Sequence, residues 1–239
     1  MSATSRGYAR WVRKLVPPVV RQRIRLLSWN ALARRDLSQL SRRMPWLYQF
    51  AELSFQAQEE IRPYYQHYVT NVSKAEMAIS WNLALLLFVF CHSIKPKKIL
   101  DLGSGFSSVL FRLYRRNYDP QCSVVSIDDS PIWLETTRRV LGLHGLSDER
   151  LSNWSEFIQE NRDAFDLVSY DLGYEHVRCE NFSKIPSLAN EGGFIVVDDA
   201  QWMDYQILIK RARRGTFKCY SLRTITLDGW GRYSLLLVR

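Results

Sequence analysis

The sequence predicts an α/β fold with a seven-stranded, mostly parallel sheet, helices on both faces and an antiparallel pair of strands at the end. From residue 98 onward, short apolar runs alternate with amphipathic helical stretches, which is typical of a parallel sheet covered on both sides. The last two apolar runs are separated only by Asp228-Gly-Trp-Gly231, which is too short for a crossover helix. The chain before residue 76 predicts a helical extension.

Five strand–helix units follow one another along the chain. Their predicted strands are residues 98–102, 123–128, 150–153, 165–171 and 194–199. The helices expected after them are residues 106–118, 131–141, 155–161, 179–189 and 202–213, the last of which ends in the basic run IKRARR. The runs at 217–227 and 232–239 then predict a hairpin closed by a short Asp-Gly turn.

Residues 77–94, MAISWNLALLLFVFCHSI, carry no charge, and their length is at the lower limit of the roughly 17–25 residues that span a bilayer. Ser80, Asn82 and His92 interrupt the run, and Lys95-Pro-Lys-Lys98 leads directly into the first strand. A spanning helix would leave no room before the domain begins. We therefore expect a buried helix.

The net charge of +9 is concentrated in the N-terminal arm. Residues 1–43 contain ten arginines and Lys14 against Asp36, a net charge of +10, so the remainder of the chain sums to −1. Apolar residues such as Trp11, Leu15 and Val16 lie between the arginines. A basic, intermittently apolar segment is typical of peripheral contact with anionic membranes. The alternative interpretation is an extension that packs its apolar stripe on the domain.

The arm does not resemble a secretory signal, because arginines interrupt every apolar run. The four cysteines, Cys91, Cys122, Cys179 and Cys219, are far apart and form no CxxC pair. This spacing argues against a zinc site or a disulfide framework and favours a reducing compartment. We expect a cytoplasmic protein, with peripheral contact at a membrane surface as a further possibility.

Four motifs lie in register at the ends of predicted strands: ILDLGSGFSS, VVSIDDS, FDLVSYD and LANEGGFIVVDD. Together they resemble the class I methyltransferases that use S-adenosylmethionine, across residues 76–239. The resemblance implies a Rossmann-like domain at 76–239 and leaves residues 1–75 as a basic helical N-terminal extension.

The glycine-rich loop of the first motif has a physical role in such a site. Gly103 and Gly105 lack a Cβ, so their backbone can approach a ligand, and the helix after them points free amides at a carboxylate. Asp101 is expected to meet the ammonium of the methionyl group through water. Asp128, one strand away, is placed to accept the ribose hydroxyls. The alternative interpretations are a tight turn for the glycines and a helix cap for Asp128.

Two further cofactor contacts follow from the resemblance. Family members contact the adenine after the third strand, where this chain has Trp154 and Ser155. Trp154 would lie against the ring and Ser155 would meet the exocyclic amine, although Trp154 could instead cap the sheet edge. Asp171, at the end of the fourth strand, is also placed among the cofactor-binding residues.

Three carboxylates are predicted to meet at one edge of the sheet, because Asp171 ends the fourth strand and Asp198 and Asp199 end the fifth. The arrangement resembles the cation-dependent catechol-type O-methyltransferases, and implies Mg²⁺ on these three residues. The family has an amide where Asp199 stands. The alternative is a metal-free site in which Asp198 or His176 orients the acceptor as a catalytic residue.

These features favour methyl transfer to a hydroxyl of a small molecule or glycan, with Trp202, Tyr205 and Trp230 as candidate pocket aromatics. A nucleic-acid methyltransferase that uses the basic arm, or an aminopropyltransferase of the same fold, are the alternatives. The first lacks an Asn-Pro-Pro-Tyr-type motif, and the second usually has N-terminal β-structure that residues 1–75 do not suggest. A nicotinamide dehydrogenase is disfavoured because Ser108 replaces its third glycine and the closing hairpin is foreign to it.

Overall fold

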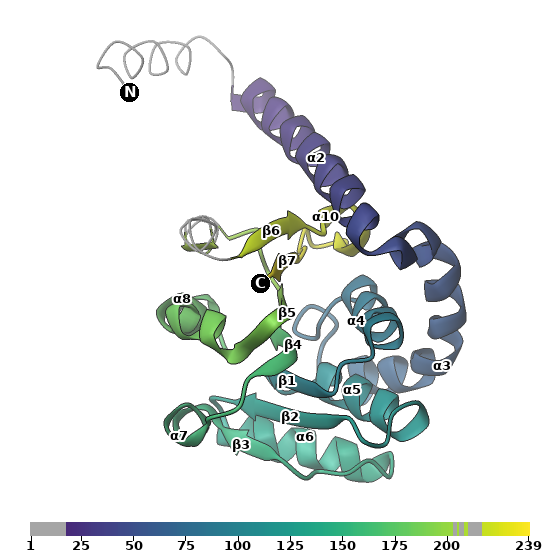
Figure 1. The fold of residues 1–239 in the computed structure, drawn as a ribbon, viewed down its shortest axis with the longest axis vertical. Coiled ribbons are helices and arrows are strands. Elements are labelled where there is room, and N and C mark those ends of the chain that lie inside the picture. Colours follow the sequence, from purple (N-terminus) through teal and green to yellow (C-terminus); the bar gives the residue numbers. More distant parts are fainter. Residues whose placement is uncertain (1–17, 203–204, 206–207, 210–216) are drawn as a thin grey trace.

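The structure is a computed structural model that describes residues 18–202, 205, 208–209 and 217–239, with side chains from residue 27 onward (Figure 1). Most of the predicted helix at 202–213 and the apolar residues Trp11, Leu15 and Val16 lie outside the described residues.

A seven-stranded sheet in the order β3-β2-β1-β4-β5-β7-β6 forms the centre of the fold (Figure 1). The first five strands pair in parallel, and β7 pairs antiparallel with both β5 and β6. This arrangement confirms the predicted fold class. The strands are β1 Lys98–Leu102, β2 Ser123–Asp128, β3 Leu151–Asn153, β4 Phe165–Tyr170, β5 Ala189–Val197, β6 Lys218–Ser221 and β7 Leu235–Val238.

Alternate residues of each strand enter two hydrophobic clusters, one on each face of the sheet. Ile99 and Leu167 belong to the first cluster, whereas their neighbours Leu100 and Val168 belong to the second. This division follows from the two-residue period of a strand. Because both faces are buried, the strands are continuously apolar in sequence.

Helices cover the two faces unequally (Figure 1). The first face packs against the larger cluster, which includes residues of α3, α4, α5 and α6, and the second face packs against α7, α8 and η2. Their bounds are α3 Phe50–Asn71, α4 Trp81–Ile94, α5 Phe106–Asn117, α6 Pro131–Leu143, α7 Trp154–Glu160, α8 Glu175–Asn181 and η2 Phe182–Leu188.

Helix α4 is the apolar segment that the sequence placed inside the protein. Nine of its residues, Leu83 to Cys91, are buried, and the Ser80 hydroxyl caps its first turn by accepting a hydrogen bond from the Leu83 amide at 3.1 Å. The prediction of a buried helix is confirmed. Among the described residues, no helix is both long and apolar enough to cross a membrane.

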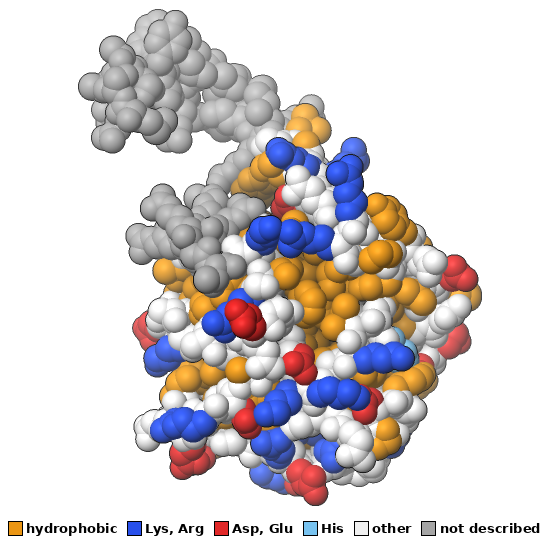
Figure 2. Space-filling model, viewed as in Figure 1, with side chains coloured by type: hydrophobic (Ala, Val, Ile, Leu, Met, Phe, Trp, Pro, Cys, Tyr) orange, Lys and Arg blue, Asp and Glu red, His pale blue; other side chains and the backbone are white. Residues whose placement is uncertain are grey.

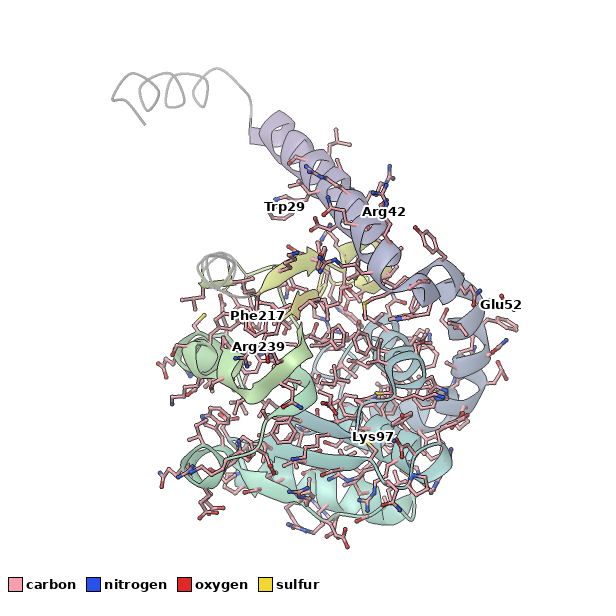
Figure 3. All side chains as sticks on the ribbon, in the orientation of Figure 1. Trp29, Arg42, Glu52, Lys97, Phe217 and Arg239 are labelled. Carbon is pink, nitrogen blue, oxygen red and sulfur yellow. The ribbon has the colours of Figure 1, made fainter. Side chains whose placement is uncertain are left out.

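The N-terminal helices are α2 Pro18–Arg43, η1 Pro45–Gln49 and α3. The first half of α2 projects from the body (Figure 1), and its second half packs against β6, where the Asp36 carboxylate accepts a hydrogen bond from the Ser221 amide at 2.9 Å. In Figure 3, Arg42 marks α2 and Glu52 marks α3. Ile61 and Tyr68 of α3 are buried in the same cluster as the sheet. A division of the chain at residue 75 therefore stays a proposal.

The predicted C-terminal strand pair is present, but the predicted short turn between its two strands is wrong. β6 and β7 do pair, and Phe217 and Arg239 at their ends are labelled in Figure 3, but residues 222–234 between them include the short helix α10 Arg223–Thr226. The Thr226 hydroxyl accepts a hydrogen bond from the Ser234 amide at 3.0 Å. Asp228 accepts from the amide of Arg232 and pairs with its guanidinium at 2.7 Å. These side-chain bonds favour a compact loop over a two-residue turn.

The helix expected at 179–189 is replaced by α8 and η2, followed directly by a longer β5. Pro186 lies in this segment and has no backbone N–H, so it removes one helical hydrogen bond and disfavours a continuous α-helix there. Smaller differences of one to three residues occur at other helix ends, where assignments are least certain from sequence.

The loop between β1 and α5 fits closely against the end of β4. Gly103 has a φ of +98°, and a Cβ there would lie 2.2 Å from the Asp171 carbonyl oxygen. No side chain can occupy that position without moving backbone. This contact brings the first motif and the fourth strand to one place.

We expect Gly103→Ala to lower the free energy of unfolding by about 1–3 kcal/mol or more, because it adds both left-handed backbone strain and a steric clash. Gly142→Ala in α6 is the matched control, since nothing lies within 4 Å of its new methyl group. It should be neutral or stabilising by up to about 1 kcal/mol. Urea unfolding measures both changes, and equal effects would show that the close contact is absent.

Candidate functional site

A cavity of about 500 Å³ lies at the carboxyl ends of the parallel strands. Its volume suits a small organic ligand. The loops after β1, β2, β4 and β5 supply most of its wall, as expected for an open parallel sheet. Of the residues predicted from sequence, the cavity is lined by Gly103, Gly105, Asp128, Asp171, Asp198 and Asp199.

The glycine-rich loop forms one wall. Gly105 lies directly before α5, and its amide donates a hydrogen bond to the Ser108 hydroxyl at 3.2 Å. The Ser108 hydroxyl in turn donates to the Asp101 carboxylate at 2.5 Å. Asp101 therefore holds the loop in place through Ser108, and the loop backbone lines the cavity.

Asp101 is fully buried beneath this loop and is not itself part of the cavity wall. Burial raises the pKa of Asp101, although the hydrogen bond from Ser108 opposes the shift. Its second oxygen, Oδ1, accepts no hydrogen bond of ordinary geometry from the described residues. A buried carboxylate oxygen without a donor is the kind of atom that an ordered water or a ligand ammonium would satisfy.

Asp128 ends β2 and lines the cavity. One of its oxygens accepts hydrogen bonds from the amide and hydroxyl of Ser104 at 2.8 and 3.2 Å, and the other accepts from the Ser130 amide at 2.9 Å. Burial raises the pKa of Asp128 to about 6. The cap of α6 is Ser130, whose hydroxyl accepts from the Trp133 amide, so Asp128 is not used as that cap. The oxygen that accepts from Ser130 has a lone pair left for a further donor, whereas the other oxygen already accepts two hydrogen bonds.

The three carboxylates after β4 and β5 come together as predicted. Asp198 accepts a hydrogen bond from the Ser234 hydroxyl at 2.8 Å, and burial, together with the neighbouring charge of Asp199, raises the pKa of Asp198 to about 6. Asp199 has a φ of +52°, which turns the chain sharply after β5. Asp171 and Asp199 are both bound by Arg178, a residue that the sequence did not single out.

Arg178 lies between these two carboxylates. Its Nη2 atom is 2.5 Å from Asp171 Oδ1, and its Nη1 atom is 2.9 Å from Asp199 Oδ2. Burial alone would lower the pKa of Arg178, but the carboxylates of Asp171 and Asp199 raise it above its usual value. The guanidinium is therefore a permanent positive charge in the wall of the cavity.

The donor set does not fit the predicted Mg²⁺ site on Asp171, Asp198 and Asp199. A guanidinium already occupies the space between two of the three carboxylates. Within the part of the chain that the structure describes, no group of three or more His, Cys, Asp or Glu side chains is arranged to hold a metal ion. We derive no chemistry through a metal.

The adenine contacts predicted for Trp154 and Ser155 do not agree with their positions. Trp154, the first residue of α7, is buried in the second hydrophobic cluster, and its indole donates a hydrogen bond to Asn181 at 3.1 Å. The hydroxyl of Ser155 donates to Asn153 at 2.7 Å, and neither side chain lines the cavity. Trp154 follows the edge strand β3, but it is a buried core residue and not the surface cap that was the alternative. Trp133 of α6 lines the cavity instead, where its indole bonds the Ser104 carbonyl.

His176 is also outside the cavity wall. It is exposed on α8, and its ring stacks on Tyr174 at a centroid distance of 6.3 Å. This position argues against a catalytic role. Of the three candidate pocket aromatics, Trp202 lines the cavity, Tyr205 is buried in the core, and Trp230 is exposed over the guanidinium of Arg232.

Tyr68 of α3 is a cavity residue that the sequence reasoning missed. It is 2% exposed, and its hydroxyl lies 3.1 Å from the position that a Cβ on Gly105 would take. Burial, with the charges of Asp101, Asp128 and Asp171, raises the pKa of Tyr68 and keeps the hydroxyl protonated. The segment before residue 76 thus contributes a hydrogen-bond donor to the cavity.

Tyr68 and Arg178, the two site residues that the sequence did not reveal, differ in how strongly the sequence signals them. Ala57, Ile61 and Tyr68 are buried on one side of α3, and their helical spacing is a signal that a search for amphipathic helices would detect. Arg178 carries no comparable signal, because its partners Asp171 and Asp199 lie on other loops and are brought to it only by the fold.

No protein-family model and no curated protein matches the sequence. Solved structures do match the fold. The SAH-bound methyltransferase PaMTH1 of Podospora anserina has 15% identity and a TM-score of 0.60, over 75% of this chain and 86% of that one. An O-methyltransferase from Bacillus cereus in complex with SAH has 14% identity and a TM-score of 0.57, over 74% and 89% of the two chains.

The O-methyltransferase TomG of Streptomyces achromogenes, in complex with SAM and involved in tomaymycin synthesis, has 19% identity and a TM-score of 0.55, over 68% of this chain and 81% of that one. Similarity at such low identity demonstrates a shared fold. The chain therefore has the fold of class I S-adenosylmethionine-dependent methyltransferases, which confirms the resemblance seen in its motifs.

Proposed function

We propose that the protein is an S-adenosylmethionine-dependent methyltransferase that methylates a hydroxyl group of a small molecule or glycan. The observation that supports this most strongly is that a single cavity is lined by the Gly103–Gly105 loop, Asp128 and the buried acid Asp198. The names of the matched structures, O-methyltransferases in complex with SAM or SAH, agree with this chemistry.

The residues present fit the cofactor. The free amides at the start of α5 and the positive end of its dipole would hold the carboxylate of the methionyl group. The Oδ1 atom of Asp101, buried beneath the loop, would accept from the ammonium through water, and the carboxylate of Asp128 would accept hydrogen bonds from the ribose hydroxyls. When bound, S-adenosylmethionine supplies an electrophilic methyl group.

Asp198 is the residue that we assign to the acceptor hydroxyl. The hydrogen bond from Ser234 fixes its carboxyl group at the cavity wall. Since burial raises the pKa of Asp198 to about 6, the group is largely ionised at pH 7 and is a stronger base than an exposed carboxylate. It can orient the hydroxyl and accept its proton, and orientation by itself contributes several kcal/mol in such reactions.

A small acceptor is favoured over nucleic acid by the charge distribution. Residues 44–239, which contain the cavity, sum to −1, whereas proteins that bind nucleic acid place lysine and arginine along the bound backbone. The basic arm is confined to residues 1–43. The aromatic side chains of Tyr68 and Trp202 in the cavity wall suit a compact acceptor.

Asp198→Asn should reduce turnover by roughly 10²–10⁴-fold, because the side chain keeps its shape but can no longer accept the proton. Affinity for S-adenosylmethionine should be nearly unchanged. Transfer of a labelled methyl group into fractionated cell extract measures turnover, and calorimetry measures binding. The wild-type rate should rise as the pH increases through about 6, where Asp198 ionises, and level off above it; this rise should be absent from the variant.

Asp163→Asn is the matched control, because Asp163 is exposed, lies outside the cavity wall and has its carboxylate paired with Lys98 at 2.8 Å. It should keep full turnover. A fully active Asp198→Asn protein would rule out the base. Failure of the wild type to bind S-adenosylmethionine, or preferential binding of a nicotinamide dinucleotide, would rule out the proposed function as a whole.

We further propose that residues 1–43 hold the enzyme at an anionic membrane. In the described part of α2, Leu27 and Leu32 are 69% and 54% exposed. Lysine and arginine side chains gather beside apolar ones where α2 meets the body (Figure 2), and Arg42 and Arg43 are exposed there. Each basic residue near an anionic bilayer contributes about 1 kcal/mol, so partial engagement of eleven suffices for binding.

A version that starts at residue 28 should lose sedimentation with vesicles that contain phosphatidylserine. It lacks seven of the eleven basic residues but keeps Ala33, Asp36 and Leu40, which pack or bond against the domain. Vesicles of neutral phosphatidylcholine are the control, and neither version should bind them. Cofactor binding should persist. Unchanged sedimentation would exclude the membrane role, and loss of S-adenosylmethionine binding would show that the arm belongs to the fold.

A further inference from the structure

The charge balance of the carboxylate cluster points to a role for Arg178 that goes beyond the proposed function. Asp171, Asp198 and Asp199 come from two neighbouring strands and converge on one wall of the cavity. Three carboxylates at such a place repel one another and need a positive charge. In this chain the arginine that forms ion pairs with these carboxylates is Arg178 of α8, and Arg232, which pairs with Asp228, lines the same cavity.

We infer that Arg178 is the resident cation of this site, that it closes the carboxylate cluster to divalent metal ions, and that it leaves Asp198 as the carboxylate that faces the acceptor. Arg178 is in this sense a positioning residue. The inference about metal ions depends only on the geometry, whereas the role of Asp198 rests on the proposed function.

The guanidinium engages two of the three carboxylates at short distance. Asp171 and Asp199 lie 2.5 and 2.9 Å from different terminal nitrogens, and the side chain of Arg178 is only 7% exposed. Planar guanidinium donors fixed in this way are strong and directional. The second oxygen of Asp199 accepts a hydrogen bond from Gln201 at 3.0 Å. A metal ion would have to displace these partners.

Contacts from behind hold the arginine in place. The Gly173 carbonyl accepts hydrogen bonds from Nε and Nη2 at 3.2 and 3.0 Å, and the ring of Trp202 lies 5.0 Å from the guanidinium carbon. The hydroxyl of Tyr170 donates to the Arg178 carbonyl at 2.9 Å, which fixes the backbone as well. The backbone, the Nε atom and the planar face of the guanidinium are thus all in contact with other residues, so the Arg178 side chain has little conformational freedom.

Asp198 differs from Asp171 and Asp199 in its bonding partner. Its side chain accepts a hydrogen bond from the neutral hydroxyl of Ser234, and no ion pair joins it to Arg178. Asp171 and Asp199 thus share the single positive charge of one guanidinium, whereas Asp198 has no ion pair with Arg178 and can accept a proton. With Arg178 bound to Asp171 and Asp199, the site would orient and deprotonate an acceptor through Asp198 without a metal ion.

Mn²⁺ is the probe that tests this inference, because it prefers carboxylate oxygens and its free form is read directly by electron paramagnetic resonance. We expect the full-length wild type to leave added Mn²⁺ free. Arg178→Met removes the charge but fills similar space, and should bind Mn²⁺ at least about tenfold more tightly than the wild type. The double variant Arg178→Met/Asp171→Asn should lose that binding. Arg178→Lys, which keeps the charge, should resemble the wild type.

Two results would overturn the inference. One is Mn²⁺ binding by the wild type that Asp171→Asn abolishes, and this test does not depend on whether any Arg178 variant folds. The other is a folded Arg178→Met protein, verified by circular dichroism, that gains no Mn²⁺ site. Calorimetry with S-adenosylmethionine on the same wild-type sample separates the two proposals. If the wild type does not bind the cofactor, the proposed function is refuted, but the conclusion about metal ions is unaffected.

Discussion

The architecture of the site depends on the contact between the loop after β1 and the end of β4. Gly103 lies so close to the Asp171 carbonyl that a methyl group there would be 2.2 Å from its oxygen. Because β1 and β4 are parallel neighbours, this contact fixes the start of α5 relative to Asp171, the acid that follows β4. The backbone amides that would meet a cofactor and the carboxylates that would meet an acceptor are thereby held in one cavity.

Burial of charge is the second constraint. Asp101, Asp128 and Asp198 are all less than 10% exposed, and each is stabilised by serine hydroxyls or amides and not by an ion pair. Burial therefore raises the pKa of each. Buried carboxyl groups with raised pKa values are common at functional sites. Arg178 pairs only with the remaining acids, Asp171 and Asp199.

The sequence predicted the parts of the fold that are encoded locally. The strand at 123–128 and the helix after Gly105 are visible because apolar runs and glycines lie next to one another in the chain. The position of Arg178 and the approach of Tyr68 were not predictable in this way, since each meets partners that are distant in sequence. Trp154 was misplaced because an aromatic residue near a strand end suits a core as well as a ring-stacking site.

A crystal structure with S-adenosylhomocysteine is the most direct test of the central claim, that the cavity holds the cofactor against the glycine-rich loop. The account predicts the ribose hydroxyls within hydrogen-bond distance of the Asp128 carboxylate. It also predicts the amino-acid carboxylate at the amides of Phe106 and Ser107 at the start of α5, with the ammonium on the side of Asp101. Electron density for the ligand elsewhere in the molecule, or a ribose without contact to Asp128, would contradict it.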